Sequence, residues 1–189
     1  MDIPRIFHIT ESAHRIHNPF TPEKLATLGA ALRLESGARV LDLGSGSGEM
    51  LCTWARDHGV VGTIELLARS LRTGGIILIG EPYWRQLPPT EDIARGCFAG
   101  SISEFLLLPE LLASFGRLGY DVVEMVLADQ DGWDRYEAAK WLTMRRWLEA
   151  NPDDEFAKEV RAKLTTEPER YAAYTREYLG WGVFALMPR

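Results

Sequence analysis

This chain of 189 residues has few of the features that mark several large classes of protein. Its two cysteines, Cys52 and Cys97, lie far apart and lack the spacing of a metal-binding motif. We therefore expect reduced thiols in a cytoplasmic protein rather than a disulfide framework. The longest apolar runs, such as residues 105–108, are far too short to cross a bilayer. The first five residues begin no apolar signal-peptide core, so we expect no secretory leader.

Positive charge is also scarce. The chain has 21 lysines and arginines against 27 aspartates and glutamates, which gives a formal net charge of −6. No run of basic residues stands out, so nucleic acid and anionic membrane are poor candidate partners. In contrast, 46% of the residues are hydrophobic, which suffices for a sizeable core. The length fits a single domain.

The most informative segment is the glycine-rich stretch at residues 38–49. An apolar run ends at Asp42, and glycine then occupies every second position, at Gly44, Gly46 and Gly48. A strand, a glycine loop and a helix in this order are typical of a nucleotide-type cofactor site. Glycines let the backbone approach the ligand closely, and unpaired N–H groups at the helix start point toward it. The dinucleotide fingerprint would need glycine or alanine at position 49, where this chain has Glu49.

The pattern D-x-G-x-G-x-G resembles motif I of the class I S-adenosylmethionine-dependent methyltransferases. Residues 76–84, preceded by a helix end at 71–75, resemble the fifth strand of that family, and residues 121–127 and 182–187 resemble its sixth and last strands. The resemblance is to an uncharacterised bacterial branch that acts on small molecules. It implies an α/β fold with a Rossmann-like sheet and S-adenosylmethionine as cofactor. It also implies a set of cofactor-binding residues, namely Asp42, Gly44, Ser45, Gly46, Ser47 and Gly48.

Much of the family's sheet, whose seven strands are ordered 3-2-1-4-5-7-6, has no counterpart in this sequence. Residues 60–63 resemble the start of strand two, and they lead directly to residues 64–73, which resemble the helix before strand five. Strands 2–4 are therefore largely missing. At about 30 residues for each βαβ unit, the gap is on the order of 80 residues. We interpret this as an internal deletion with its junction near Thr63 and Ile64, and we predict that strand one lies beside strand five.

Residues 60–66 also allow a second interpretation, in which they form strand two. Glu65 would then be the acid that binds the ribose hydroxyls, at an acceptable distance from the glycine loop. However, apolar residues recur at helical spacing from Ile64 to Leu71, and Gly74 follows as a helix stop. We favour the helix and keep Glu65 as a secondary candidate for cofactor binding.

The resemblance divides the chain into four parts of one methyltransferase-like domain. These are an N-terminal helical lead (1–37), a truncated Rossmann-like core (38–127), a helical insert (128–180) and the last strand (181–189). Within them we predict helices over 21–33, 91–97 and 103–117, a strand over 76–80, and a loop over 82–90. The insert reads as helical from 133 to about 179, with breaks at Asn151-Pro152 and near Glu167-Pro168. Its aromatic residues either pack the insert on the sheet or line an acceptor pocket.

Glu81 and Tyr83 are candidates for the acceptor site. They follow the core of the predicted fifth strand, and open α/β sheets bind ligands at the carboxyl ends of their strands. The neighbouring Trp84 and Arg85 add an indole and a guanidinium to this cluster. The alternative is a structural turn set by Pro82.

Three histidines lie near the start of the chain, at His8, His14 and His17. In the family the leading segment often folds over the cofactor, so His14 or His17 could act as a base or contact the acceptor. The alternative is a surface helix with scattered histidines. Their spacing matches no zinc pattern, so we predict no metal.

These features allow three functions. The favoured one is S-adenosylmethionine-dependent methyl transfer to an unidentified small molecule, with an activity that the deletion could impair. The second is a non-catalytic remnant without cofactor binding, because a buried strand that loses its neighbour leaves costly unpaired backbone groups. The glycine spacing argues against the third, a nicotinamide-dependent oxidoreductase. An exposed sheet edge left by the missing strands would favour self-association.

Overall fold

A computed structural model describes residues 4–14, 17–32, 64, 68–69, 71–72 and 74–189 of the chain. They form two compact units, which are described separately. The helical unit comprises Met1–Thr21, Tyr83–Leu107 and Ala128–Gly180, and the sheet unit comprises Pro22–Pro82, Leu108–Leu127 and Trp181–Arg189. The organisation of residues 1–189 as a single domain stays a prediction.

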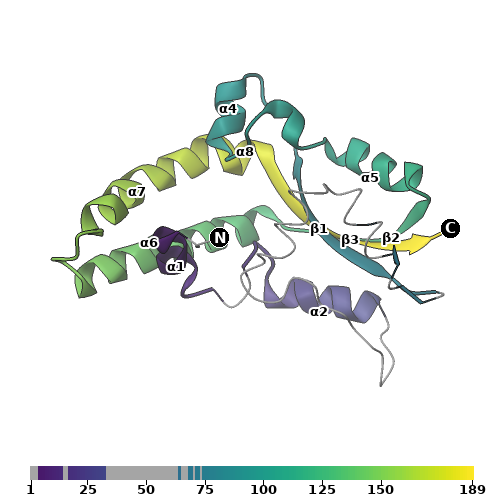
Figure 1. The fold of residues 1–189 in the computed structure, drawn as a ribbon, viewed down its shortest axis with the longest axis horizontal. Helices are drawn as coiled ribbons and strands as arrows, with labels where there is room; N and C mark the ends of the chain where they lie inside the picture. The colour runs from purple at the N-terminus through teal and green to yellow at the C-terminus, as the bar shows by residue number, and fades with distance from the viewer. Residues whose placement is uncertain (1–3, 15–16, 33–63, 65–67, 70, 73) are drawn as a thin grey trace. The chain divides into compact units, whose positions relative to one another are not determined.

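The sheet unit is built on three strands, β1 (Ile77–Trp84), β2 (Tyr120–Leu127) and β3 (Leu179–Pro188), although the outer ends of β1 and β3 continue into the helical unit. β3 lies between β1 and β2, which is the order expected for strands five, seven and six (Figure 1). β2 and β3 are antiparallel, from Tyr120 opposite Pro188 to Leu127 opposite Gly182. The strands predicted over 76–80, 121–127 and 182–187 are confirmed, and so is the α/β class.

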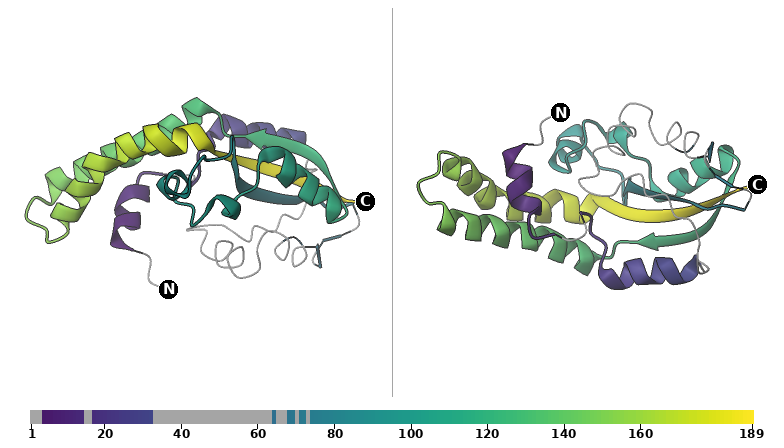
Figure 2. Two further views of the ribbon diagram at one scale, coloured as in Figure 1. Left: turned by 90° about the horizontal axis from the view of Figure 1, so that it is seen from above. Right: turned by 60° about the horizontal axis from the view of Figure 1, so that its bottom comes forward.

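Two amphipathic helices cover this sheet. α2 (Pro22–Ala31) and α5 (Leu108–Arg117) lie on opposite faces of it (Figures 1 and 2). From α5, Leu111 and Phe115 are buried, and the Phe115 ring centroid lies 5.5 Å from that of Phe184 in β3. The helix predicted over 103–117 therefore begins later, at Leu108, where Pro109 suits the first turn because its missing N–H costs nothing there.

The loop predicted over 82–90 begins later than expected, because β1 continues to Trp84. Pro82 therefore lies inside the strand rather than at the start of a loop. In the helical unit, the backbone N–H of Trp84 donates to Leu106 O over 2.8 Å, and the Trp84 side chain is fully buried. The structural turn considered at Pro82 is thus wrong.

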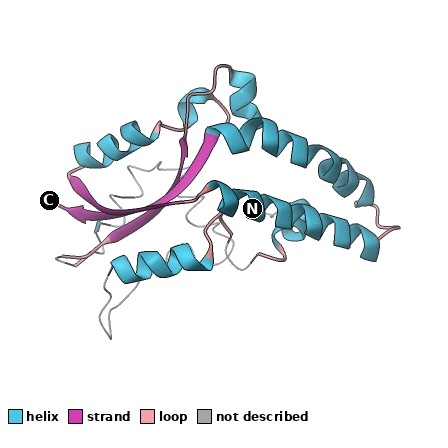
Figure 3. Ribbon diagram, turned by 180° about the vertical axis from the view of Figure 1, so that it is seen from behind, coloured by secondary structure: helices cyan, strands magenta, loops and turns pink. Residues whose placement is uncertain are grey.

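The helical unit contains a pair of long helices, α6 (Gln130–Ala150) and α7 (Ala157–Arg170), which lie side by side (Figures 1 and 3). The short α1 (Arg5–Glu11) packs on them. A core of Ile9, Met144, Leu148 and Val160 joins the three helices. The insert between the last two strands is therefore helical, as predicted, and its break at Asn151-Pro152 is confirmed.

The second predicted break, near Glu167-Pro168, is wrong. α7 runs through Pro168 to Arg170 and continues into η2 (Tyr171–Thr175), a π-helical turn, and α8 (Arg176–Tyr178). A proline removes one backbone hydrogen bond, but it need not end a helix whose neighbouring residues are fixed. Here Glu167 pairs with Arg170 at 2.9 Å and with Lys163 at 3.3 Å, which holds the helix on both sides of Pro168.

A second core in the helical unit surrounds Trp84. It includes Ala94 and Cys97 from the region of α4 (Glu91–Gly96), which confirms the helix predicted over 91–97, and it packs against η1 (Ile102–Glu104). Cys97 is a buried free thiol, and burial raises its pKa to about 11. It is therefore a packing residue rather than a reactive nucleophile.

Candidate functional site

The predicted cofactor cradle lies outside the described residues. This applies to Asp42, Gly44, Ser45, Gly46, Ser47, Gly48 and Glu65, to strand one, and to Thr63 at the predicted junction. Next to the junction, the described residues Ile64 and Ala68 are helical, as the favoured interpretation of residues 64–73 predicts.

His14 lies in a buried polar cluster. Its Nδ1 is 2.9 Å from Oε2 of Glu11, the last residue of α1. The Glu11 side chain is 7% exposed and that of His14 is 10% exposed, so water screens the pair weakly. Because an ionised carboxylate only accepts hydrogen bonds, the contact places a proton on His14 Nδ1. In the neutral imidazole, Nε2 is then the acceptor.

Two residues of α6 complete this Glu11–His14 cluster. The Tyr136 hydroxyl donates to Glu11 Oε2 over 3.2 Å, and Lys140 Nζ lies 3.4 Å from Glu11 Oε1. The rings of His14 and Tyr136 stack with centroids 4.4 Å apart. Burial, aided by the charge of Glu11, raises the pKa of Tyr136 far above its usual value, so the phenol stays protonated and donates.

The second imidazole nitrogen of His14 is the open position of the cluster. Nε2 is buried and has no hydrogen-bond partner within the described part of the chain, and the same holds for Nε1 of Trp133. The Trp133 ring meets Tyr136 edge-on at 6.5 Å. An unmade buried hydrogen bond costs about 1–3 kcal/mol. A carboxylate-oriented imidazole with a free Nε2 is the arrangement that general bases use.

The other histidines do not join this cluster. His17 is exposed and meets the Phe7 ring edge-on at 6.4 Å, and His8 is exposed on α1. Among the residues that the structure describes, no group of histidine, cysteine and acidic side chains could hold a metal ion. Of the candidates His14 and His17, it is thus His14 that lies in a network of polar side chains.

Glu81 lies in the sheet unit, on β1. Burial raises its pKa to about 7, and its carboxyl group forms no hydrogen bond to another described residue. A carboxyl group in this state can exchange a proton near neutral pH, as general acids and bases do.

Tyr83 lies in the helical unit, where it is buried against β3. An added Cβ at Gly180 would lie 2.3 Å from the Tyr83 ring, so this contact requires glycine. Burial raises the pKa of Tyr83, and the positive charge of Arg85 lowers it. The ring therefore packs against the strand, which favours a structural role.

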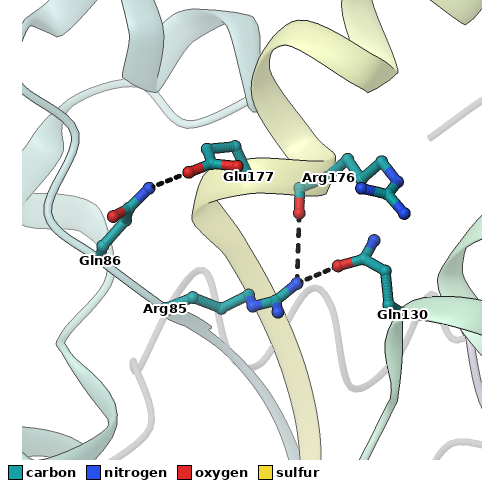
Figure 4. Close-up of a pocket in the computed structure, with 5 residues that line it drawn as sticks. All are labelled: Arg85, Gln86, Gln130, Arg176 and Glu177. Atoms are coloured by element: carbon teal, nitrogen blue, oxygen red, sulfur yellow. Dashed lines mark hydrogen bonds between the residues drawn. The ribbon is translucent and has the colours of Figure 1, made fainter.

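A polar pocket of about 370 Å³ lies at the point where the chain leaves β1. Figure 4 shows its lining side chains, which are Arg85, Gln86, Gln130, Arg176 and Glu177. Arg85 Nη1 donates to Oε1 of Gln130 and, over 3.2 Å, to the main-chain oxygen of Arg176. Gln86 Nε2 donates to Glu177 Oε1 over 2.6 Å. We call this site the Arg85 pocket. The one sequence feature that indicates it is the position of Arg85 directly after a predicted strand.

The partners of His14 could not be predicted from the sequence. Glu11 and Tyr136 are 125 residues apart, and no local pattern links them. The only signal is that Tyr136 and Lys140 are four residues apart on a helix and so share a face.

Comparison with solved structures identifies the class of protein. A methyltransferase from Geobacter sulfurreducens, solved with S-adenosyl-L-homocysteine, is 68% identical, with a TM-score of 0.90 over 100% of this chain and 99% of that one. One from Thiobacillus denitrificans, also solved with S-adenosyl-L-homocysteine, is 63% identical, with a TM-score of 0.90 over the whole of both chains. This chain therefore belongs to the S-adenosylmethionine-dependent methyltransferases. The family predicted from its sequence is confirmed, and S-adenosylmethionine is the cofactor of that family.

A particular relative is the uncharacterised protein YjhP of Escherichia coli strain K12. It is 56% identical over 248 residues, and the alignment covers the whole of both sequences. Its X-ray structure matches with a TM-score of 0.88 over 98% of this chain and 100% of that one. No family model matches the sequence. In the described part of the chain, no helix is long and apolar enough to cross a membrane.

Proposed function

We propose that this chain transfers the methyl group of S-adenosylmethionine to a small-molecule acceptor. One observation carries the proposal. Two relatives at 68% and 63% identity, which match this chain over its whole length, were solved with the demethylated product of that cofactor. We propose that the cofactor is bound by Asp42 and by the glycine loop of Gly44 to Gly48 with Ser45 and Ser47, while Glu65 stays a secondary candidate.

A small acceptor suits the helical insert. Aromatic side chains of the insert are buried or half-buried, among them Trp133, Trp141 and Tyr171, and aromatic surfaces line most small-molecule sites. The net charge of −6 disfavours nucleic acid as the substrate.

His14 is the proposed general base, with Glu11 as its positioning residue. The cofactor supplies an activated methyl group. As the acceptor atom forms its bond to that methyl carbon, the carbon–sulfur bond breaks and sulfur keeps the electron pair. An acceptor that carries a proton must then lose it, and His14 Nε2 would receive it. Glu11 holds the imidazole through Nδ1 at 2.9 Å and stabilises the imidazolium that forms.

The internal deletion near Thr63 and Ile64 remains part of the proposal. The alignment with YjhP runs over 248 residues, whereas this chain has 189, so it includes positions at which this chain has no residue. This supports a missing segment without locating it. The relatives do not favour the remnant interpretation, since they match the whole chain.

The experiment is to incubate the purified chain with S-adenosylmethionine and a panel of small phenols, amines, thiols and carboxylic acids. Mass spectrometry then measures formation of S-adenosylhomocysteine. We expect acceptor-dependent product that falls by about two orders of magnitude in His14→Gln, the range of general-base catalysis. His17→Gln is the matched control because His17 is exposed and lies outside the cluster. Equal activity in the two variants would refute the role of His14.

A further inference from the structure

We infer that the Arg85 pocket binds a carboxylate group of the methyl acceptor. The inference rests on the proposed function and adds a substrate class to it. Its first support is position. Arg85 follows the last residue of β1 directly, and ligands of open α/β sheets bind beyond the carboxyl ends of the strands.

The second support is the charge balance of the two guanidinium groups in the pocket. Arg176 is neutralised by Asp134, because its Nε and Nη2 lie 3.0 and 3.2 Å from the two carboxylate oxygens. In the described part of the chain, the Arg85 guanidinium donates only to neutral oxygens, those of Gln130 and of the Arg176 main chain. It forms no ion pair with a described carboxylate, although Glu177 lines the same pocket, and its positive charge partly offsets the rise that burial causes in the pKa of Tyr83.

The third support is the orientation of the Arg85 guanidinium. Both of its contacts use Nη1, which has two protons, so that nitrogen is fully occupied (Figure 4). The opposite edge, formed by Nε and Nη2, carries N–H donors for which the structure gives no partner among the described residues. This edge is the fork that binds a carboxylate through two parallel hydrogen bonds. Gln130 holds the fork in place, since its own Nε2 is 3.4 Å from the Tyr171 hydroxyl.

The remaining acidic side chain selects the kind of anion. Glu177 also faces the pocket, and Gln86 fixes it at 2.6 Å. Its negative charge opposes a dianion such as phosphate more strongly than a singly charged carboxylate. The pocket volume of about 370 Å³ is enough for a small acid.

The test is to titrate the full chain with benzoate and with benzamide and to measure the binding of each probe by ligand-observed NMR. The two probes have the same shape and differ in charge. We expect benzoate to bind at least about tenfold more tightly than benzamide, the size expected for a charge-assisted hydrogen-bond pair. Arg85→Gln should abolish that preference, and Arg85→Lys should restore only part of it because lysine lacks the fork. Inorganic phosphate should bind more weakly than benzoate.

Arg95→Gln is the matched control, since Arg95 is an exposed arginine that pairs with Asp92. Equal binding of the two probes, a preference that survives Arg85→Gln, or the same loss in both arginine variants would overturn the inference. Tighter binding of phosphate than of benzoate would also overturn the carboxylate assignment. Thermal unfolding of each variant separates loss of binding from loss of folding.

Titration of the same samples with S-adenosylhomocysteine keeps the two proposals apart. A wild-type chain that prefers benzoate through Arg85 but does not bind S-adenosylhomocysteine would refute the proposed function and leave a carboxylate site. A chain that binds S-adenosylhomocysteine without any preference for benzoate would refute only the pocket.

Discussion

At the scale of residues, the Glu11–His14 cluster links packing to chemistry. A surface histidine needs no second residue to orient it. Here Glu11, Tyr136 and Lys140 surround a side chain that is 10% exposed, and the Nε2 atom is left without a partner among the described residues. The cluster therefore leaves one imidazole nitrogen, Nε2, available to a ligand.

This organisation predicts non-additive effects on methyl transfer. Glu11→Gln should lower the rate by roughly tenfold, because it removes the carboxylate that orients the base, and His14→Gln by roughly a hundredfold. In the double variant the loss should be close to that of His14→Gln alone, since Glu11 acts only through His14. Steady-state kinetics of the three variants would measure this. Losses that multiply would show that Glu11 acts independently.

Glu81 predicts a dependence of stability on pH. Its pKa is about 7 in the folded state against 4.5 for the ordinary group, so the folded state binds the proton more tightly. The contribution of Glu81 to the free energy of unfolding is therefore fully present below the ordinary pKa, and it is lost as the pH rises through the folded-state pKa of about 7. Glu81→Gln should remove the loss and stabilise the protein above pH 7 by up to about 3 kcal/mol.

Thermal unfolding at pH 4 and pH 8 measures this effect. The gain should be far larger at the higher pH, because at the lower one Glu81 is mostly protonated in both states. A variant with the same gain at both values would show that burial of charge at position 81 is not the cause.

At the scale of elements, the sequence predicted best where apolar periodicity and turn residues agree. The strand over 121–127 and the helix over 91–97 were predicted correctly, because apolar periodicity and turn residues place the ends of each element within a few residues. The errors arose at prolines. Pro82 lies within a strand and Pro168 within a helix, because the surrounding contacts fix the backbone on both sides. Contacts between distant elements, such as Glu11 with Tyr136, leave no local signal.

The start of α6 provides a test of these local rules. Oδ1 of Asp129 accepts the N–H of Gly132 over 2.7 Å and so caps the helix. Asp129→Ala should destabilise the chain by about 1 kcal/mol. Asp131→Ala is the control, because Asp131 pairs with Arg135 at the exposed surface, where solvent screens an ion pair strongly. Urea denaturation of both variants gives the comparison, and an equal loss in the two would show that the cap does not matter.

At the scale of the whole molecule, the family could be predicted from one motif and three strands, and relatives at 63% and 68% identity confirm it. The acceptor could not be predicted, because the candidate residues come from segments that only the fold brings together. The association through a sheet edge stays a prediction. The position of the deletion also stays a prediction.

The proposed function requires above all that this chain binds the methyltransferase cofactor. Calorimetric titration with S-adenosylhomocysteine tests it most directly, with Gly46→Val as the matched variant, because a valine side chain would block close approach of the loop to the ligand. We expect a dissociation constant on the order of micromolar for the wild-type chain and no measurable binding for Gly46→Val. A wild-type chain that unfolds cooperatively on heating yet binds no S-adenosylhomocysteine would contradict it.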